Sequence, residues 1–146
     1  MTDQFIVIIE ALVCRADHYV VVRRSLNEDQ APGALSFVSG KIEAESPEED
    51  ILEATVRREL REEIDLEVGE LAYVFSNAFR NDRGEMVICL TYLCRDSGGE
   101  PSVHAPDEVE SVGWMRADDL LAHPDAAPWL RESMRRAEAL RQRLGW

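Results

Sequence analysis

The stretch that decides the fold runs from Gly40 to Leu66 and reads GKIEAESPEEDILEATVRRELREEIDL. Apolar residues at four-residue steps predict that its second half is a helix, because such residues share one side of a helix with about 3.6 residues per turn. These apolar residues are Val56, Leu60 and Ile64. Three carboxylates fall in a neighbouring arc of roughly 100°. They are Glu59, Glu62 and Glu63.

Like charges this close together on one helix need an explanation. Each such pair costs a few tenths of a kcal/mol on an isolated helix. A hard divalent cation offsets the repulsion, since Mg²⁺ binds carboxylate oxygens and keeps several waters that a phosphate can displace. A solvated acidic face is the alternative, and it is the commoner origin of a charge run. Arg57 and Arg61 fall on a third face, which we expect to be solvated.

The residues around these carboxylates resemble the Nudix box, G-x5-E-x7-R-E-U-x-E-E-x-G-U, in which U is a bulky aliphatic residue. Residues 58–63 read R-E-L-R-E-E and match the centre of this motif. Gly40 matches its opening glycine, and Leu66 matches its closing aliphatic residue. The chain is therefore similar to the Nudix hydrolases over about residues 5–122, and the box is the specific part of that resemblance.

The first half of the box departs from the family pattern. Glu45 follows Gly40 after four residues, and Arg58 follows Glu45 after twelve, so this part is longer than in the motif. Either Glu45 or Asp50 takes the place of the first box glutamate. The sequence leaves the choice between them open.

Capping features predict where the helix begins and ends. Pro47 suits a first helical turn, with Ser46 as its N-cap and Glu49 at capping-box spacing. The helix is therefore expected to start as early as Pro47 and to run to Ile64. Asp65 occupies the place of the motif's last glycine. A left-handed residue often follows a helix end, and Asp adopts that conformation more readily than most residues.

Length and charge limit the partners. The chain has 146 residues, which suits a single domain over residues 1–146 with a proper core. Its net charge of −13 argues against a nucleic-acid polymer or an anionic membrane as a partner. A small phosphorylated substrate is compatible with this charge when cations screen it. The oligomeric state stays open, a homodimer included.

Hydropathy and cysteine use predict a cytoplasmic protein. The apolar run from Phe5 to Ile9 is cut by Glu10 and is far shorter than the roughly 20 residues that span a membrane. It also lacks the basic flank and cleavage site of a signal peptide. The three cysteines form no Cys-x-x-Cys pair and are expected to be buried in a reducing compartment. They are Cys14, Cys89 and Cys94.

The other segments predict a mixed sheet between helices, an α/β/α sandwich of the α/β class. Apolar runs predict a hairpin over residues 4–24 whose strands are covered on both faces, because the pattern does not alternate cleanly. Further strands are expected over residues 35–38, 66–75 and 85–95 and around Trp114, and helices over residues 118–121 and about 128–144. The resemblance names this arrangement the Nudix fold.

The resemblance also implies a chemistry. It implies hydrolysis of a diphosphate linkage that depends on Mg²⁺, or on Mn²⁺ in its place. The residues that it places at the metal are Glu59, Glu62, Glu63 and Gly40. It implies that Arg58 orients these carboxylates through an ion pair with an upstream acid, Glu45 or Asp50.

Three positions are candidates for the general base: Glu62, Glu59 and a glutamate near residue 108. Acidic residues precede the strand that carries Trp114, as in Nudix proteins that draw a further glutamate from this loop. Glu108 is the first candidate there and Glu110 the second. The alternative for each is an ordinary exposed acid.

Basic residues are scarce, with 16 against 29 acidic ones, so those near the motif matter. Arg24 ends the second strand and Lys41 follows Gly40, and both are candidates to contact a substrate phosphate. A solvated strand end is the alternative for Arg24. Four aromatic residues could stack on a base, but their apolar neighbours favour the core: Tyr19, Phe37, Phe75 and Phe79. The three histidines, at positions 18, 104 and 123, are expected at the surface.

The predicted activity is that of a pyrophosphohydrolase acting on a nucleoside diphosphate derivative. A nucleoside di- or triphosphate is the first choice, with nucleotide sugars and dinucleoside polyphosphates close behind. One alternative is a Nudix-like module that binds or senses a nucleotide without hydrolysing it. The intact R-E-x-x-E-E pattern argues against it, since a sensor need not keep three metal carboxylates. The other alternative is an acidic interaction protein whose helix binds cations loosely.

Overall fold

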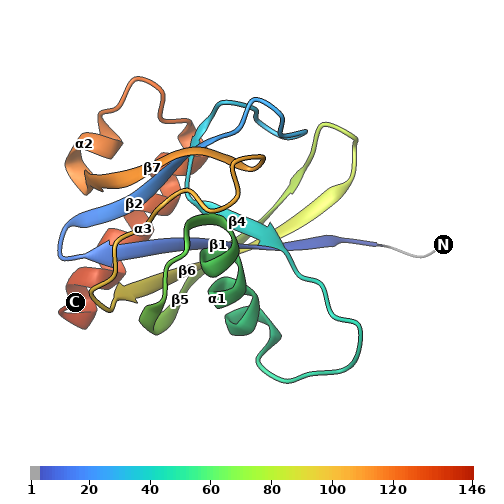
Figure 1. The fold of residues 1–146 in the computed structure, drawn as a ribbon, viewed down its shortest axis with the longest axis horizontal. Helices are drawn as coiled ribbons and strands as arrows, with labels where there is room; N and C mark the ends of the chain where they lie inside the picture. The colour runs from blue at the N-terminus through green and yellow to red at the C-terminus, as the bar shows by residue number, and fades with distance from the viewer. Residues whose placement is uncertain (1–3) are drawn as a thin grey trace.

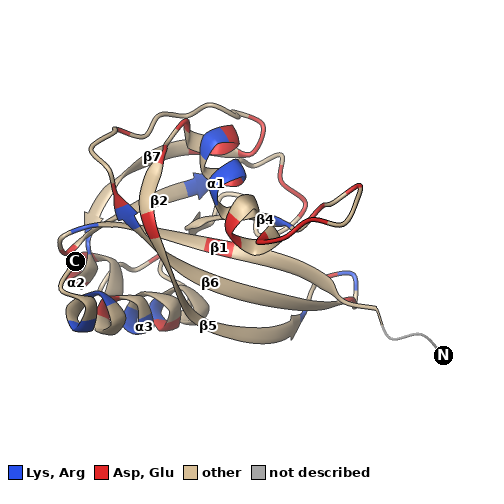
Figure 2. Cartoon of the chain, turned by 90° about the horizontal axis from the view of Figure 1, so that it is seen from below, with Lys and Arg blue, Asp and Glu red and all other residues tan. Residues whose placement is uncertain are grey.

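A mixed β-sheet forms the centre of the molecule, and helices cover both of its faces (Figures 1 and 2). The computed structural model describes residues 4–146, and these contain seven strands and three helices. The strands are β1 (Ile6–Arg15), β2 (His18–Arg24), β3 (Leu35–Ser36), β4 (Val38–Lys41), β5 (Val68–Arg80), β6 (Met86–Asp96) and β7 (Val109–Arg116). The helices are α1 (Ile51–Ile64), α2 (Ala117–Leu121) and α3 (Pro128–Leu144). The predicted α/β/α sandwich with a mixed sheet is confirmed.

The sheet branches at β1. Its main order is β3-β2-β1-β6-β5, while β4 pairs with β1 and β7 pairs with β2. Strands β1 and β6 are parallel, and the other pairs are antiparallel. β1 pairs with β2 only at its C-terminal end, and its N-terminal half pairs with β4, where Ile9 lies opposite Gly40. This branch places Gly40 next to α1.

β1 is buried on both faces, as its apolar pattern predicts. The residues that face α1 are Ile9, Ala11 and Val13, which share a core with Val56, Leu60 and Ile64. The residues that face α3 include Leu12 and Cys14, which share a second core with Leu130, Met134 and Ala137. Figure 2 shows the sheet between α1 on one side and α3 on the other. Two separate hydrophobic cores therefore pack against the two faces of the sheet.

α1 begins at Ile51, so the predicted start at Pro47 is wrong. Its N-cap, Asp50, has a left-handed backbone with φ of 54°. The acidic loop over residues 43–50 is exposed and carries no large apolar side chain. Capping preferences alone do not make this loop helical, because most helical stability comes from packing an apolar face. The other end is as predicted: Asp65 is left-handed with φ of 52°.

Other boundaries differ from prediction in ways that pairing explains. The strand expected over residues 35–38 is two strands, because β3 pairs with β2 whereas β4 pairs with β1. β5 begins at Val68 and runs on to Arg80, where a turn leads into β6. α3 spans Pro128–Leu144, as predicted.

The three cysteines are free and buried, as predicted. Among residues 4–146, no helix is long and apolar enough to cross a membrane.

Candidate active site

Glu59 of α1 lies against Gly40 of β4. A side-chain carbon added to Gly40 would lie 2.1 Å from Cδ of Glu59, which is far too close for two unbonded carbons. With the Glu59 carboxyl group where it lies, only a glycine fits at position 40. The opening glycine of the motif thus leaves space for Glu59, one of the three glutamates.

Glu59 and Glu63 form a buried carboxyl pair. They lie one helical turn apart and are only 8% and 6% exposed. Burial raises the pKa of both carboxyl groups, and the neighbouring Glu59 raises the pKa of Glu63 further. Oε2 of Glu63 is buried and has no hydrogen-bond partner among the described residues. Since such an oxygen is costly to bury, a cation bound here would stabilise the ionised pair.

Glu62 lies at the rim of this pair. Its side chain is 56% exposed, and its Oε2 lies 3.3 Å from Nη1 of Arg58. The structure thus brings together two of the three glutamates that share an arc, and turns the third toward solvent.

Arg58 links the carboxylates to β4. Its Nη1 lies 3.2 Å from Oε1 of Glu59, and its Nη2 donates to the carbonyl of Lys41 at 3.2 Å. The predicted ion pair with an upstream acid is wrong: within residues 4–146, neither Glu45 nor Asp50 pairs with Arg58, and both are exposed. The long acidic loop carries these two acids away from Arg58.

The two arginines expected on a solvated face behave differently. Arg61 is exposed, as predicted. Arg57 is partly buried and donates to the carbonyls of Val68 and Gly69 at 2.8 and 2.9 Å. The prediction is wrong for Arg57 because the start of β5, where the pairing with β6 shifts register, lies beside this face of α1.

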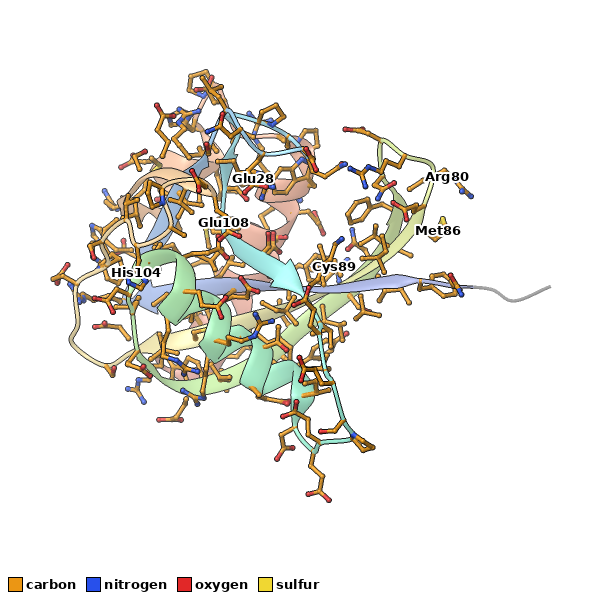
Figure 3. All side chains as sticks on the ribbon, turned by 45° about the vertical axis from the view of Figure 1, so that its right-hand side comes forward. Glu28, Arg80, Met86, Cys89, His104 and Glu108 are labelled. Atoms are coloured by element: carbon orange, nitrogen blue, oxygen red, sulfur yellow. The ribbon has the colours of Figure 1, made fainter. Side chains whose placement is uncertain are left out.

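Glu108 joins the acidic site from the turn before β7. Its pKa is raised by burial and then by the carboxylates of Glu28 and Glu62. Figure 3 shows Glu28 and Glu108 near one another above α1. Glu108 and the second candidate, Glu110, are both exposed. Glu28 was not predicted, because it lies in the loop after β2 and nothing local marks it.

The two predicted phosphate ligands are placed differently. Arg24 lies beside the acidic site. Its positive charge opposes the rise in the pKa of Glu63 and Glu108. Its guanidinium is already engaged, however, by Glu28 at 3.1 Å and by the carbonyl of Gln30 at 2.8 Å. Lys41 is exposed, and its carbonyl accepts from Arg58.

Two of the four aromatic residues lie in the core, as predicted, and Phe75 is only half-buried. Tyr19 and Phe37 are fully buried. The prediction of a core position is wrong for Phe79, which is 42% exposed and lies in the exposed C-terminal part of β5. Arg136 lies over the ring of Phe75 at 4.5 Å.

These residues fit a divalent cation, although no three acid, imidazole or thiol side chains of residues 4–146 converge as a finished ligand set. The unpartnered oxygen of Glu63, next to the carboxyl group of Glu59, makes the best match. Hard cations bind carboxylate oxygens, and Mg²⁺ needs only one or two of them besides water and phosphate. Glu62 and Glu108 lie at the rim of the same site.

A second buried carboxyl group, Glu10, lies on the opposite face of the sheet. Its Oε1 accepts hydrogen bonds from Thr91 at 2.8 Å and from Ser133 of α3 at 2.7 Å. Burial raises its pKa. The sequence shows Glu10 only as a break in an apolar run, and its partners lie 81 and 123 residues away.

A family model for the NUDIX domain matches residues 5–137 of the chain. The fold is shared with the MutT NUDIX hydrolase of Burkholderia pseudomallei, at 24% identity and a TM-score of 0.77, over 92% of this chain and 98% of that one. The ORF135 protein of E. coli matches at 28% identity and a TM-score of 0.69, over 95% and 92% of the two chains.

A third similar structure is the NUDIX domain of Shewanella oneidensis NrtR, complexed with ADP ribose. It is 19% identical, with a TM-score of 0.73, over 98% of this chain and 90% of that one. No curated protein matches the sequence.

Proposed function

The chain belongs to the NUDIX domain family and is a Nudix hydrolase that acts on phosphoric anhydride bonds, and from this premise we propose that it hydrolyses nucleoside di- or triphosphates with Mg²⁺. The observation that carries this proposal is the buried pair Glu59–Glu63 against Gly40, with one carboxyl oxygen unpartnered. A purely structural acidic helix would leave its carboxylates in water.

The carboxylates have distinct roles in this proposal. Glu59 and Glu63 would hold the cation, with Glu62 completing the site from the rim. Arg58 keeps Glu59 and Glu62 in place, since it contacts both. When bound, the divalent cation neutralises the charge that phosphate oxygens gain during the reaction.

Glu108 is our choice for the general base. Water attacks phosphorus and gives a proton to Glu108, while the P–O–P bond breaks and its electron pair leaves with the departing phosphate. A base works best when its pKa lies near the working pH. The raised pKa of Glu108, caused by burial and by Glu28 and Glu62, moves it in that direction. Glu108 is exposed, so water can reach it.

The substrate class follows from charge and from the family. An acidic surface with few free basic groups suits a small phosphorylated molecule that arrives with a cation. The Shewanella neighbour was crystallised with ADP ribose, a nucleoside diphosphate derivative. Nucleotide sugars and dinucleoside polyphosphates are therefore tested beside nucleoside di- and triphosphates.

A nucleotide panel with Mg²⁺ tests the proposal through released phosphate. Inorganic pyrophosphatase is added for nucleoside di- and triphosphates. Alkaline phosphatase is added for nucleotide sugars and dinucleoside polyphosphates, whose hydrolysis leaves terminal phosphate groups. Glu62→Gln should lower turnover at least about a hundredfold, the scale of lost acid–base or metal assistance. Glu67→Gln, an exposed acid just after α1, is the matched control and should retain activity. Full activity in Glu62→Gln would reject the assignment. Tight nucleotide binding without turnover in the wild type would instead identify a binding module.

A further inference from the structure

The loop over residues 97–108, between β6 and β7, closes the C-terminal end of α1. The last carbonyl groups of a helix have no partners within it. Here the loop supplies them: the N–H of Ser102 donates to Ile64 at 2.9 Å, and the N–H groups of His104 and Ala105 donate to Glu63 at 2.9 and 3.3 Å. The loop is thus bound to the same helical turn that carries the candidate metal ligands.

The side chain of His104 adds another bond to this end. Its Nδ1 lies 3.1 Å from the carbonyl oxygen of Glu62. A carbonyl oxygen only accepts, so Nδ1 must carry the hydrogen in this contact. His104 is exposed, as the sequence predicts, and core packing therefore does not hold its ring. Figure 3 shows it at the end of α1.

A short chain of hydrogen bonds links this contact to Glu108. The N–H of Ala105 donates to Glu63, while the carbonyl of Ala105 accepts from the N–H of Glu108 at 2.9 Å. The carbonyl of Glu108 accepts from the N–H of Ser25 at 2.9 Å. The position of Glu108 relative to the α1 carboxylates therefore depends on how the loop sits on the helix end.

The beginning of the loop is fixed separately by Arg15. Its guanidinium pairs with Asp96 and Glu100 at 2.8 and 2.7 Å and lies 4.3 Å from the ring of Trp114. Trp114 in turn donates to Glu100 at 3.0 Å. Between this anchor and Glu108, His104 is the residue whose side chain bonds to the helix.

We propose that His104 is a positioning residue, which holds Glu108 against the α1 carboxylates through its bond to the Glu62 carbonyl. This inference rests on the proposed function, because it assumes that Glu108 takes part in hydrolysis. A stabilising contact without a role in the reaction would also be lost on substitution, so the test must separate the two.

Substitutions at position 104 distinguish a positioning role from a purely stabilising contact, because they change where the donor lies. In His104→Asn, Nδ2 is attached to Cγ just as Nδ1 is in histidine, so the donor is kept. In His104→Gln the donor lies one bond further out. We expect His104→Ala to lower kcat about tenfold, the scale of a lost supporting contact, with KM changed less than about twofold. His104→Asn should recover most of kcat and His104→Gln should not. His18→Ala, an exposed histidine at the start of β2, is the control.

A double-mutant cycle with Glu108→Gln tests the route of the effect. If His104 acts by placing Glu108, His104→Ala should lower kcat less than about twofold when Glu108 is already glutamine. If the losses of kcat in the two single variants multiply in the double variant, the proposal is overturned. Full kcat in His104→Ala would also overturn it. Glu108→Gln with wild-type kcat would overturn it too.

Hydrogen exchange gives a readout without substrate or metal. The amides of Ser102, His104, Ala105 and Glu108 should exchange about tenfold faster in His104→Ala than in the wild type, while the β1 amides stay unchanged. If the wild type hydrolyses nothing in the panel, the proposed function fails, and exchange alone decides whether His104 fixes the loop. Unchanged exchange would overturn the positioning role in either case.

Discussion

Glu10 and the Glu59–Glu63 pair are buried to nearly the same degree on opposite faces of one sheet, yet their surroundings differ. Glu10 is 6% exposed, and one of its oxygens accepts from two hydroxyl groups. Glu63 is also 6% exposed, but one of its oxygens has no donor, and the neighbouring carboxyl group of Glu59 raises its pKa. Burial alone therefore does not mark a functional acid. The missing donor does, because it leaves a place for a ligand.

The strongest test of whether the two faces differ in function is to neutralise one carboxyl group on each face. Glu59→Gln should lower kcat/KM for the nucleotide substrate at least about a hundredfold, since it removes a charge that the proposed cation needs. Glu10→Gln should stay within about threefold of the wild type, because its amide oxygen still accepts from Thr91 and Ser133. Steady-state kinetics with Mg²⁺ measure both. Equal losses in the two variants would show that the two faces do not differ in function.

Gly40→Ala tests the space around Glu59. The added carbon would lie 2.1 Å from Cδ of Glu59, so either this carboxyl or β4 must move. We expect at least a tenfold loss of activity, on the order of what a misplaced reacting group costs, and about 1–3 kcal/mol of destabilisation from overpacking.

Gly113→Ala is the matched control for this substitution. Gly113 lies in β7, and a carbon added there meets no atom within 4 Å. Denaturant unfolding and kinetics on both variants separate lost stability from lost activity. An active, stable Gly40→Ala would mean that Glu59 does not need its present position.

Metal addition distinguishes the two faces without any substrate. Mg²⁺ at about 100 times its Kd should stabilise the wild type by about 2.7 kcal/mol, because it binds only the folded state. Glu63→Gln should lose most of this gain, and Glu10→Gln should keep it. Thermal unfolding with and without Mg²⁺ measures the difference. A gain that survives in Glu63→Gln would place the cation elsewhere.

The sequence predicts features that depend on nearby residues better than features that depend on residues far along the chain. The helix that carries R-E-L-R-E-E and the left-handed Asp65 depend on neighbours within a turn or two, and the structure has both. Glu10 depends on strand pairing, since Thr91 reaches it only when β1 and β6 lie parallel in register. The same holds for His104, which meets α1 through a loop 42 residues further along.

Capping rules also failed to predict the start of α1, because packing of apolar side chains determines where that helix begins. The capping pattern around Pro47 is sound, yet no apolar side chain follows it until Ile51, and the helix begins there. The expected partners of Arg58 lie in that same loop, so the error in the helix start carries over to the ion pair. Sequence reasoning therefore identified the three glutamates, but it could not tell which of them are buried together.

The smallest expected effect is on the pH dependence of stability at Glu10. Burial raises the pKa of Glu10 in the folded protein above its unfolded value, so the folded state holds the proton more tightly. The resulting stabilisation is fully present below the unfolded pKa and is lost as pH rises through the folded pKa. Glu10→Gln carries no such proton, and its stability relative to the wild type should therefore increase from acid toward neutral pH. Urea unfolding of both proteins from pH 4 to pH 8 measures this difference, and parallel curves would mean that Glu10 keeps the same affinity for its proton when the chain unfolds.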